Sequence, residues 1–295
     1  RFVASDDPRT KQIPEYSGKI DYMPSKSFKL DIDRDKIIQK GVVSQAFNHK
    51  IDSLMTIRLN KNVLLKNELM VLDMLATTNW DRPMYYAVTV GSDNYAGLQN
   101  YFQLEGFAYR IVPIKSNNED GQTGRVDTER MYKRLMEDFR WGGYNDPRVY
   151  LDENILRMAL NIRNNLTRLA NSLLDEGKKE KAIAVLDKTM KELPAPQVPH
   201  NYFSIFIAQG YYKAGIPQKG DEIMNELAAE NLQELVYFTS LKASMRQTIS
   251  NDMERNIAIY YEINRIANQY QRGDLMKNLS AQYTNVLNKT GFFNQ

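Results

Sequence analysis

Residues 152–190 read DENILRMALNIRNNLTRLANSLLDEGKKEKAIAVLDKTM, and this stretch decides the fold of the C-terminal half. Its apolar residues recur at the three- and four-residue spacing that marks one face of a helix. Asp152 is placed to accept the free amides of a first helical turn. Gly177 supplies the left-handed backbone on which a helix ends. We therefore expect a helix over 153–175 that folds back on a second helix ending before Pro194.

The same pattern returns 38 residues later. Corresponding positions are Ala170 and Ala208, Leu173 and Tyr211, Gly177 and Gly215, Val185 and Ile223, and Leu186 and Met224. Tetratricopeptide (TPR) repeats have a period of 34, and the extra residues fall in the proline-rich link 194–199. We expect Ala170, Ala182 and Ala208 at close helix crossings. Further helices are expected near 232–248, 252–271 and 274–289, capped by Asp252 and Asp274, so that residues 151–295 form a TPR-like helical repeat domain.

The N-terminal half alternates between strand-like and helix-like stretches. Strands are expected at 28–33, 53–59, 84–90 and 107–114, and helices at 64–75, at 94–102 and from an Asp127 cap to 139. This order favours a small, mostly parallel α/β sheet, preceded by an extended arm over 1–30. The Gly-rich break at 141–147 marks the boundary between an α/β domain, 1–150, and the helical domain, 151–295. The expected fold class is thus α+β/α.

The composition excludes several classes of function. Hydrophobic residues are 42% and charged residues 25% of the 295 residues, as in a globular protein. The net charge of +3 is too small to indicate nucleic-acid binding. The absence of cysteine excludes disulfides, thiolate metal sites and a cysteine nucleophile. Because the chain begins at Arg1 without a leader, we expect a piece of a longer protein.

No motif indicates a catalytic residue, a metal or a cofactor. The two histidines, His49 and His200, lie far apart in the sequence, and the common metalloprotease, nucleotide-binding and nucleophile motifs are missing. Residues 31–35, DIDRD, resemble the start of a calcium loop. However, Lys36 and Val42 occupy the positions that require Gly and Glu in such a loop.

Two segments of the α/β part attract attention, residues 79–86 (NWDRPMYY) and 95–110 (YAGLQNYFQLEGFAYR). Both lie at ends of expected strands, where open parallel sheets bind ligands. Their aromatic faces would stack on sugars, and their charged groups would bind hydroxyls. The candidate ligand or interface residues are Trp80, Arg82, Tyr85, Tyr95, Tyr101, Glu105, Tyr109 and Arg110. The alternative, which we favour, is that they are core or interface residues, with Arg82 buried against Asp81, Asp93 or Glu105.

The same segments carry a family resemblance. They fit the patterns N-W-x-R-P-x-Y from Asn79 and Y-x-G-L-x-x-Y-F-Q-L-E-G-x-A-Y-R-x-x-P-I from Tyr95. Further matching stretches are 67–73, 139–142 and 168–170 with the turn at 176–178. Together they resemble the soluble C-terminal region of a family of multi-pass membrane proteins that is abundant in Bacteroidetes. The membrane part of that family is similar to GT-C glycosyltransferases, and an animal relative acts as a protein O-mannosyltransferase.

The resemblance implies an extracytoplasmic domain of a membrane glycosyltransferase-like protein, on the periplasmic side of the inner membrane. Its implied partners are its own N-terminal membrane domain and an acceptor polypeptide or glycan, and its implied role is binding or scaffolding. The acidic catalytic residue would lie in the membrane half, so none is carried over to this chain. The alternative is a carbohydrate-binding module centred on Trp80 and the tyrosines. A third hypothesis is that the α/β part is a free-standing enzyme, and only the expected fold supports it.

Overall fold

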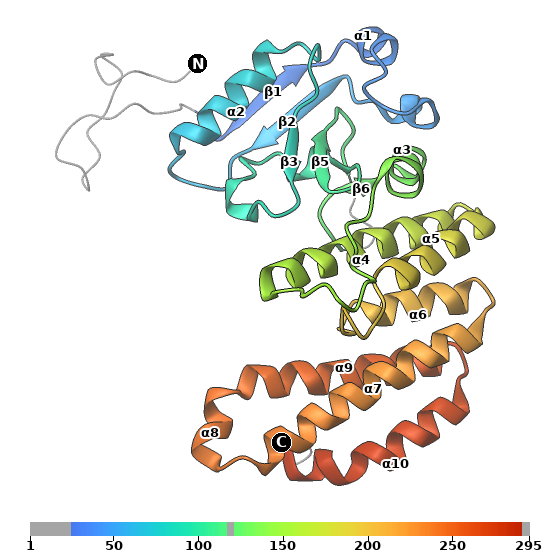
Figure 1. The fold of residues 1–295 in the computed structure, drawn as a ribbon. Coiled ribbons are helices and arrows are strands. Elements are labelled where there is room, and N and C mark those ends of the chain that lie inside the picture. The colour runs from blue at the N-terminus through green and yellow to red at the C-terminus, as the bar shows by residue number, and fades with distance from the viewer. Residues whose placement is uncertain (1–24, 117–120, 291–295) are drawn as a thin grey trace, which may run out of the picture. The chain divides into compact units, whose positions relative to one another are not determined.

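The computed structural model describes residues 25–116 and 121–290 (Figure 1). The chain divides into two compact units, Arg1–Arg134 and Leu135–Gln295, so the division falls earlier than the expected boundary after residue 150. Most of the extended arm expected over residues 1–30 lies outside the described residues. The two units are described separately below.

The first sheet of the N-terminal unit is a pair of antiparallel strands, β1 (Ser27–Asp31) and β2 (Leu54–Arg58). Met55 and Ile57 of β2 are buried, whereas the alternate residues of β2 face away from this core. Between the strands lie α1 (Arg34–Gln39) and a 3-10 turn, η1 (Gln45–Lys50). Asp33, from the stretch that resembles a calcium loop, caps α1 by accepting a hydrogen bond from the Lys36 amide.

The second sheet is mixed and contains β3 (Tyr85–Ala87), β4 (Phe102–Leu104), β5 (Ala108–Ile111) and β6 (Arg125–Val126). The strand order is β3-β5-β4-β6, and of the described pairs β4–β6 alone is parallel. The expected mostly parallel sheet is therefore wrong. The reason is the connection 105–107 between β4 and β5, which is far too short for the crossover that parallel strands require.

Strand β4 was missed because residues 94–102 were expected to form a helix. That stretch instead contains a 3-10 turn, η3 (Gln99–Tyr101), and leads directly into β4; another, η2 (Ser92–Asn94), precedes it. Besides α1, this unit contains the helices α2 (Lys66–Thr77) and α3 (Thr128–Tyr132). Asp127 caps α3 as expected, by accepting from the Arg130 amide, and a wider π-turn, η4, continues the helix over Lys133–Asp138.

The described part of the C-terminal unit contains helices and no strand, as expected. The helices are α4 (Glu153–Asp175), α5 (Lys179–Glu192), α6 (Ser204–Lys213), α7 (Pro217–Ser240), α8 (Ala243–Thr248), α9 (Ser250–Gln269) and α10 (Gly273–Thr290). α4 packs on α5, α6 packs on α7, and α10 contacts both α7 and α9. Ala170, Ala182 and Ala208 are fully buried. Asp152 caps α4 as expected, by accepting from the Ile155 amide at 2.8 Å.

Some expected helix ends are wrong. No separate helix begins near 232, because α7 continues from Gly220 to Ser240 without a further glycine or proline. Asp252 and Asp274 lie inside the first turns of α9 and α10 rather than at their caps. Neither helix has a local sequence signal at its actual start as clear as Asp152 is for α4.

Three helix ends of the C-terminal unit share one hydrogen-bonding pattern, in which two successive amides bond back to the last turn. The left-handed residues are Gly177, Gly215 and Gln271, with φ of 74°, 73° and 56°. The amide of each next residue donates to the carbonyl five positions earlier, at 2.8, 2.9 and 2.8 Å. The turns at Gly177 and Gly215 reproduce the 38-residue offset. The third escaped sequence reasoning because Gln271 occupies the place of glycine.

Candidate functional site

Three of the candidate tyrosines lie in the core of the N-terminal unit. The rings of Phe102 and Tyr109 stack at 5.4 Å, and Tyr95 meets Phe102 edge-on at 4.9 Å. Tyr95, Tyr101 and Tyr109 are buried, and burial raises the pKa of the neighbouring Tyr86 to about 12. The Tyr101 hydroxyl accepts a hydrogen bond from the Thr56 amide at 2.9 Å. These rings therefore stabilise the fold and do not present a stacking platform for a sugar.

Trp80 and Arg82 lie beside a surface pocket with about 10 Å³ of free space, also lined by Arg110. That is room for about one water molecule, not for a sugar. Trp80 is half-buried, with a left-handed φ of 64°, but Arg82 is exposed. The expectation that Arg82 is buried against an acid is therefore wrong. The adjacent acid, Asp81, is instead bound by Lys40, which lowers the pKa of the Asp81 carboxyl.

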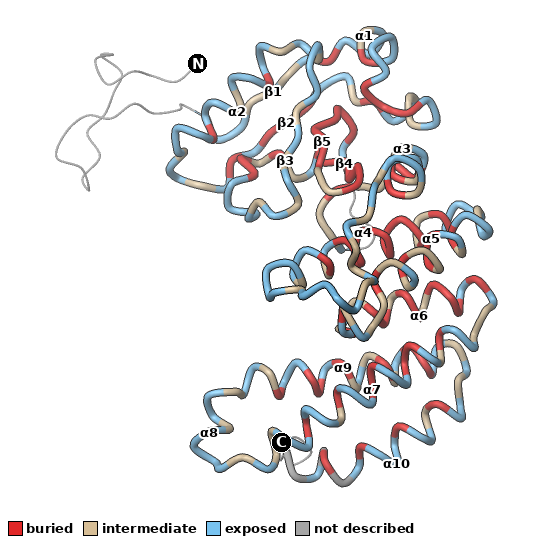
Figure 2. The backbone as a smooth tube through the Cα atoms, viewed as in Figure 1, coloured by how far each residue is buried: buried red, intermediate tan, exposed pale blue. Residues whose placement is uncertain are grey.

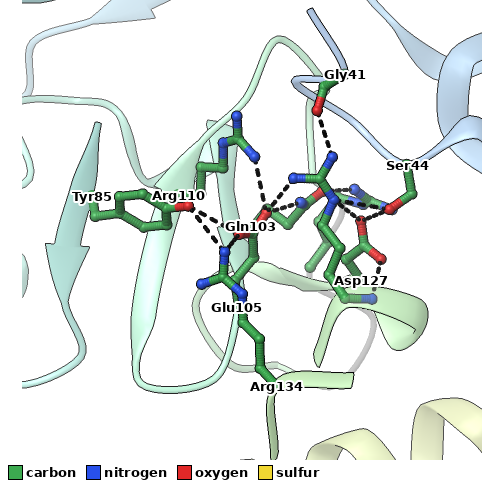
Figure 3. Close-up of polar contacts among 10 residues, drawn as sticks. Gly41, Ser44, Tyr85, Gln103, Glu105, Arg110, Asp127 and Arg134 are labelled. Atoms are coloured by element: carbon green, nitrogen blue, oxygen red, sulfur yellow. Dashed lines mark hydrogen bonds and ion pairs between the residues drawn. The ribbon is translucent and has the colours of Figure 1, made fainter. Parts of the chain in front are cut away.

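The structure brings three other candidates, Tyr85, Glu105 and Arg110, into one polar cluster (Figure 3). The strand register aligns Tyr85 of β3 with Arg110 of β5, Arg110 with Gln103 of β4, and Gln103 with Arg125 of β6. These four side chains form a row across the sheet, since paired residues of neighbouring strands share a face. Glu105 directly follows β4. Because it lies two residues after Gln103 in an extended chain, its side chain points to the same face as that row.

Glu105 is the centre of the cluster, with its side chain fully buried. Three guanidinium groups surround its carboxylate, from Arg110 at 3.6 Å, Arg130 at 3.4 Å and Arg134 at 3.0 Å. The Tyr85 hydroxyl donates to one carboxylate oxygen at 3.1 Å, and the Gln103 amide donates to the other at 2.6 Å. A buried carboxylate is tolerated because partners of this kind replace its lost hydration.

Arg130 extends the cluster to the segment that follows α1. Its guanidinium donates to the Gly41 carbonyl at 2.6 Å and to the Ser44 hydroxyl at 3.1 Å. Ser44 in turn donates to the Asp127 carboxylate at 2.6 Å. The network thus joins the second sheet, α3 and the segment after α1, three parts that are distant in sequence.

The cluster, defined as Ser44, Tyr85, Gln103, Glu105, Arg110, Arg125, Asp127, Arg130 and Arg134, carries four guanidinium groups against two carboxylates. Both oxygens of Glu105 already accept hydrogen bonds or ion pairs. This occupancy favours a structural role for Glu105 over proton transfer. The side chains of the described residues form no group of three or more metal-ligating types arranged for an ion.

Sequence reasoning missed Gln103, Arg125, Arg130 and Arg134. Gln103 and Glu105 alternate around Leu104, a strand signal that lies directly after the expected helix 94–102. Arg130 and Arg134 are four residues apart, which places them on one side of a helical turn. Neither signal shows by itself that these side chains meet a glutamate.

Residues 1–130 match the family model described as TMEM260-associated domain 2. The match covers both quoted segments and most of the cluster, and leaves the helical unit outside it. Comparison with curated proteins and with solved structures found no match for the chain. None of the helices in the described ranges is both long enough and apolar enough to cross a bilayer.

Proposed function

We propose that this chain is the extracytoplasmic C-terminal part of a TMEM260-like membrane protein with a glycosyltransferase-like, protein O-mannosyltransferase-like membrane domain. The match of residues 1–130 to a TMEM260-associated domain carries the proposal. In it, the chain lies on the periplasmic side of the inner membrane. It binds the acceptor polypeptide and supports the membrane domain, and sugar transfer occurs elsewhere in the protein.

The surface of α2 supports a contact with that membrane domain. This helix buries Glu68 and Leu75 but exposes Met70 and Met74 by 55% and 44%, and Leu65, directly before the helix, is 54% exposed. Glu68 is held inward by Lys61 at 2.8 Å and by the Leu65 amide at 2.9 Å. In Figure 2 most of α2 is coloured as exposed. Large apolar side chains gathered on an exposed helix mark an interaction surface, so we assign this face to the membrane domain.

The helical unit supports acceptor binding. Stacked helix pairs present extended surfaces that suit polypeptides, and α4 to α7 form two such pairs. Large apolar side chains exposed on this unit include Tyr202, Val236, Tyr237, Met245 and Tyr261. Tyrosine is enriched where proteins bind one another. These residues therefore favour a polypeptide partner for this unit.

A crosslinking experiment on the full-length protein tests the proposed contact. A photoreactive amino acid replaces Met70 of α2, and a control replaces Glu129, an exposed residue of α3 in the same unit. After irradiation in membranes, the Met70 position should crosslink to membrane segments of the same polypeptide. Equal crosslinking from both positions, or products confined to other proteins, would show that α2 does not contact the membrane domain.

The isolated chain provides the second test. With polyprenyl-phosphate sugars and peptide acceptors it should bind peptides without transferring sugar. Peptide and glycan arrays then identify the bound class, and Tyr237→Ser should weaken peptide binding. Sugar transfer that persists through repeated purification would contradict the proposal, as would binding to glycans alone.

A further inference from the structure

A second site lies on the other side of β2 from its buried core. The open face of β2 borders a hollow of about 440 Å³, within the range of small-molecule sites. Thr56 and Arg58 line it from β2, Gln99 and Asn100 line it from η3, and Lys115 lines it from the segment after β5. Three stretches of chain that are distant in sequence thus form its walls. None of the candidate residues except Tyr101 belongs to it.

Hydrogen bonds between the walls hold the hollow open in one shape. Tyr101 accepts from the Thr56 amide at 2.9 Å, which ties η3 to β2. The Ser116 amide donates to the Asn100 carbonyl at 2.6 Å. The Lys115 amide donates to the Asp52 carboxylate at 3.1 Å, which ties the third wall to the segment that leads into β2. A binding site whose walls are already fixed loses little conformational freedom when a ligand binds.

Gly97 shows how closely the walls approach. Its φ of 79° is left-handed, and a Cβ at this position would collide with the Arg58 carbonyl. Only glycine allows the loop before η3 to lie against β2 in this way.

The polar groups that face the hollow differ from those of the Glu105 cluster. Within the described part of the chain, the side chains of Arg58, Gln99, Asn100 and Lys115 make no hydrogen bond or ion pair. Two of them are cations, whereas Asp52, the one acid of the hollow, already accepts from a backbone amide. The hollow therefore offers two cationic groups and the amides of Asn60, Gln99 and Asn100 to a ligand.

We propose that this hollow binds a small anionic saccharide, a sugar ring that carries one carboxylate or phosphate group. Arg58 and Lys115 bind the anionic group, because guanidinium and ammonium groups pair with carboxylate and phosphate oxygens. Gln99 and Asn100 bind the hydroxyls, because an amide both donates and accepts, as a hydroxyl does. The proposal does not depend on the parent protein, since it rests on the geometry of the N-terminal unit alone.

Titration of the purified 295-residue chain, followed by calorimetry and amide NMR shifts, tests the proposal. The probes are glucuronate and glucose 6-phosphate, with glucose and inorganic phosphate for comparison. At least one anionic sugar should bind saturably and at least tenfold more tightly than either comparison probe, with shifts at Thr56 and Asn100. Which of the two binds identifies the anionic group. If neither binds, or if phosphate alone binds as tightly as the sugar, the proposal is overturned.

Variants distinguish specific binding in this hollow from nonspecific attraction of anions to the positively charged side chains of the protein. Arg58→Gln should weaken binding about tenfold or more, the usual effect of losing a hydrogen bond to a charged group, and Asn100→Ala should weaken it less. Arg82→Gln is the matched control, because Arg82 is an exposed arginine of the same unit outside the hollow. All variants should keep the wild-type melting temperature. Equal affinities of Arg58→Gln and Arg82→Gln would refute the assignment.

Discussion

Replacing Glu105 by glutamine should destabilise the N-terminal unit more than any exposed substitution in it. The amide keeps the size of the side chain but removes the charge that three guanidinium groups share. Its NH₂ group would also face the donors of Gln103 and Arg110, which now point at acceptor oxygens. The expected result is a fold that forms but unfolds at a lower denaturant concentration.

The exposure of each arginine determines how much stability the Glu105→Gln substitution removes. The side chain of Arg134 is 44% exposed, so water screens much of its interaction. The side chains of Arg110 and Arg130 are only 11% and 24% exposed. Removing one partner of a buried ion pair costs about 3–5 kcal/mol. With two arginines mostly buried and glutamine retaining part of the hydrogen bonding, we expect about 3 kcal/mol, or a fall in Tm of roughly 10 °C.

Tryptophan fluorescence reports on this unit alone after one substitution. The chain has two tryptophans, Trp80 in the N-terminal unit and Trp141 in the C-terminal unit. In a Trp141→Phe background, urea unfolding monitored by emission therefore follows the surroundings of Trp80. The free energy of unfolding of Glu105→Gln is compared with that of the background protein.

Glu129→Gln is the matched control, because Glu129 is an exposed glutamate of the same unit. It should change the free energy of unfolding by less than about 1 kcal/mol. A Glu105→Gln variant whose free energy of unfolding lies within about 1 kcal/mol of the background would refute the reasoning. The charge of Glu105 would then add no net stability to the folded unit.

Four further outcomes are expected. Arg82→Ala should leave Tm almost unchanged, because Arg82 is exposed; a large loss would reveal a buried partner. Gln271→Gly should raise the urea midpoint by relieving a left-handed φ of 56°, worth up to about 1 kcal/mol, and a lower midpoint would contradict this. Gly220→Ala should lower Tm, because the new Cβ would collide with the Tyr212 ring; an unchanged Tm would show that the ring moves freely. Burial lowers the pKa of His200, so the folded state binds its proton less readily than the unfolded state. Stability is therefore lost as pH falls below about 6.5, and urea unfolding at pH 7.5 and 5.5 should show a larger loss for wild type than for His200→Gln.

Local sequence patterns determined most of the helical unit. The apolar spacing of 153–175, the Asp152 cap and the turn at Gly177 act within one or two helical turns, so neighbouring residues suffice to specify them. The same reasoning located the Asp127 cap of α3. It failed at Gln271, where an exposed non-glycine residue adopts the left-handed conformation that sequence reasoning assigns to glycine.

The tertiary structure alone decided the sheets and both sites. Strand pairing depends on residues far apart in sequence, so alternating patterns indicated strands but not the antiparallel register that aligns Tyr85, Arg110, Gln103 and Arg125. The sequence identified Glu105 and Arg110 as charged residues of interest, but their partner Arg130 lies 25 residues beyond Glu105. Arg82 illustrates the same limit, because burial is set by whatever packs against a side chain, and the adjacent acid was already bound by Lys40.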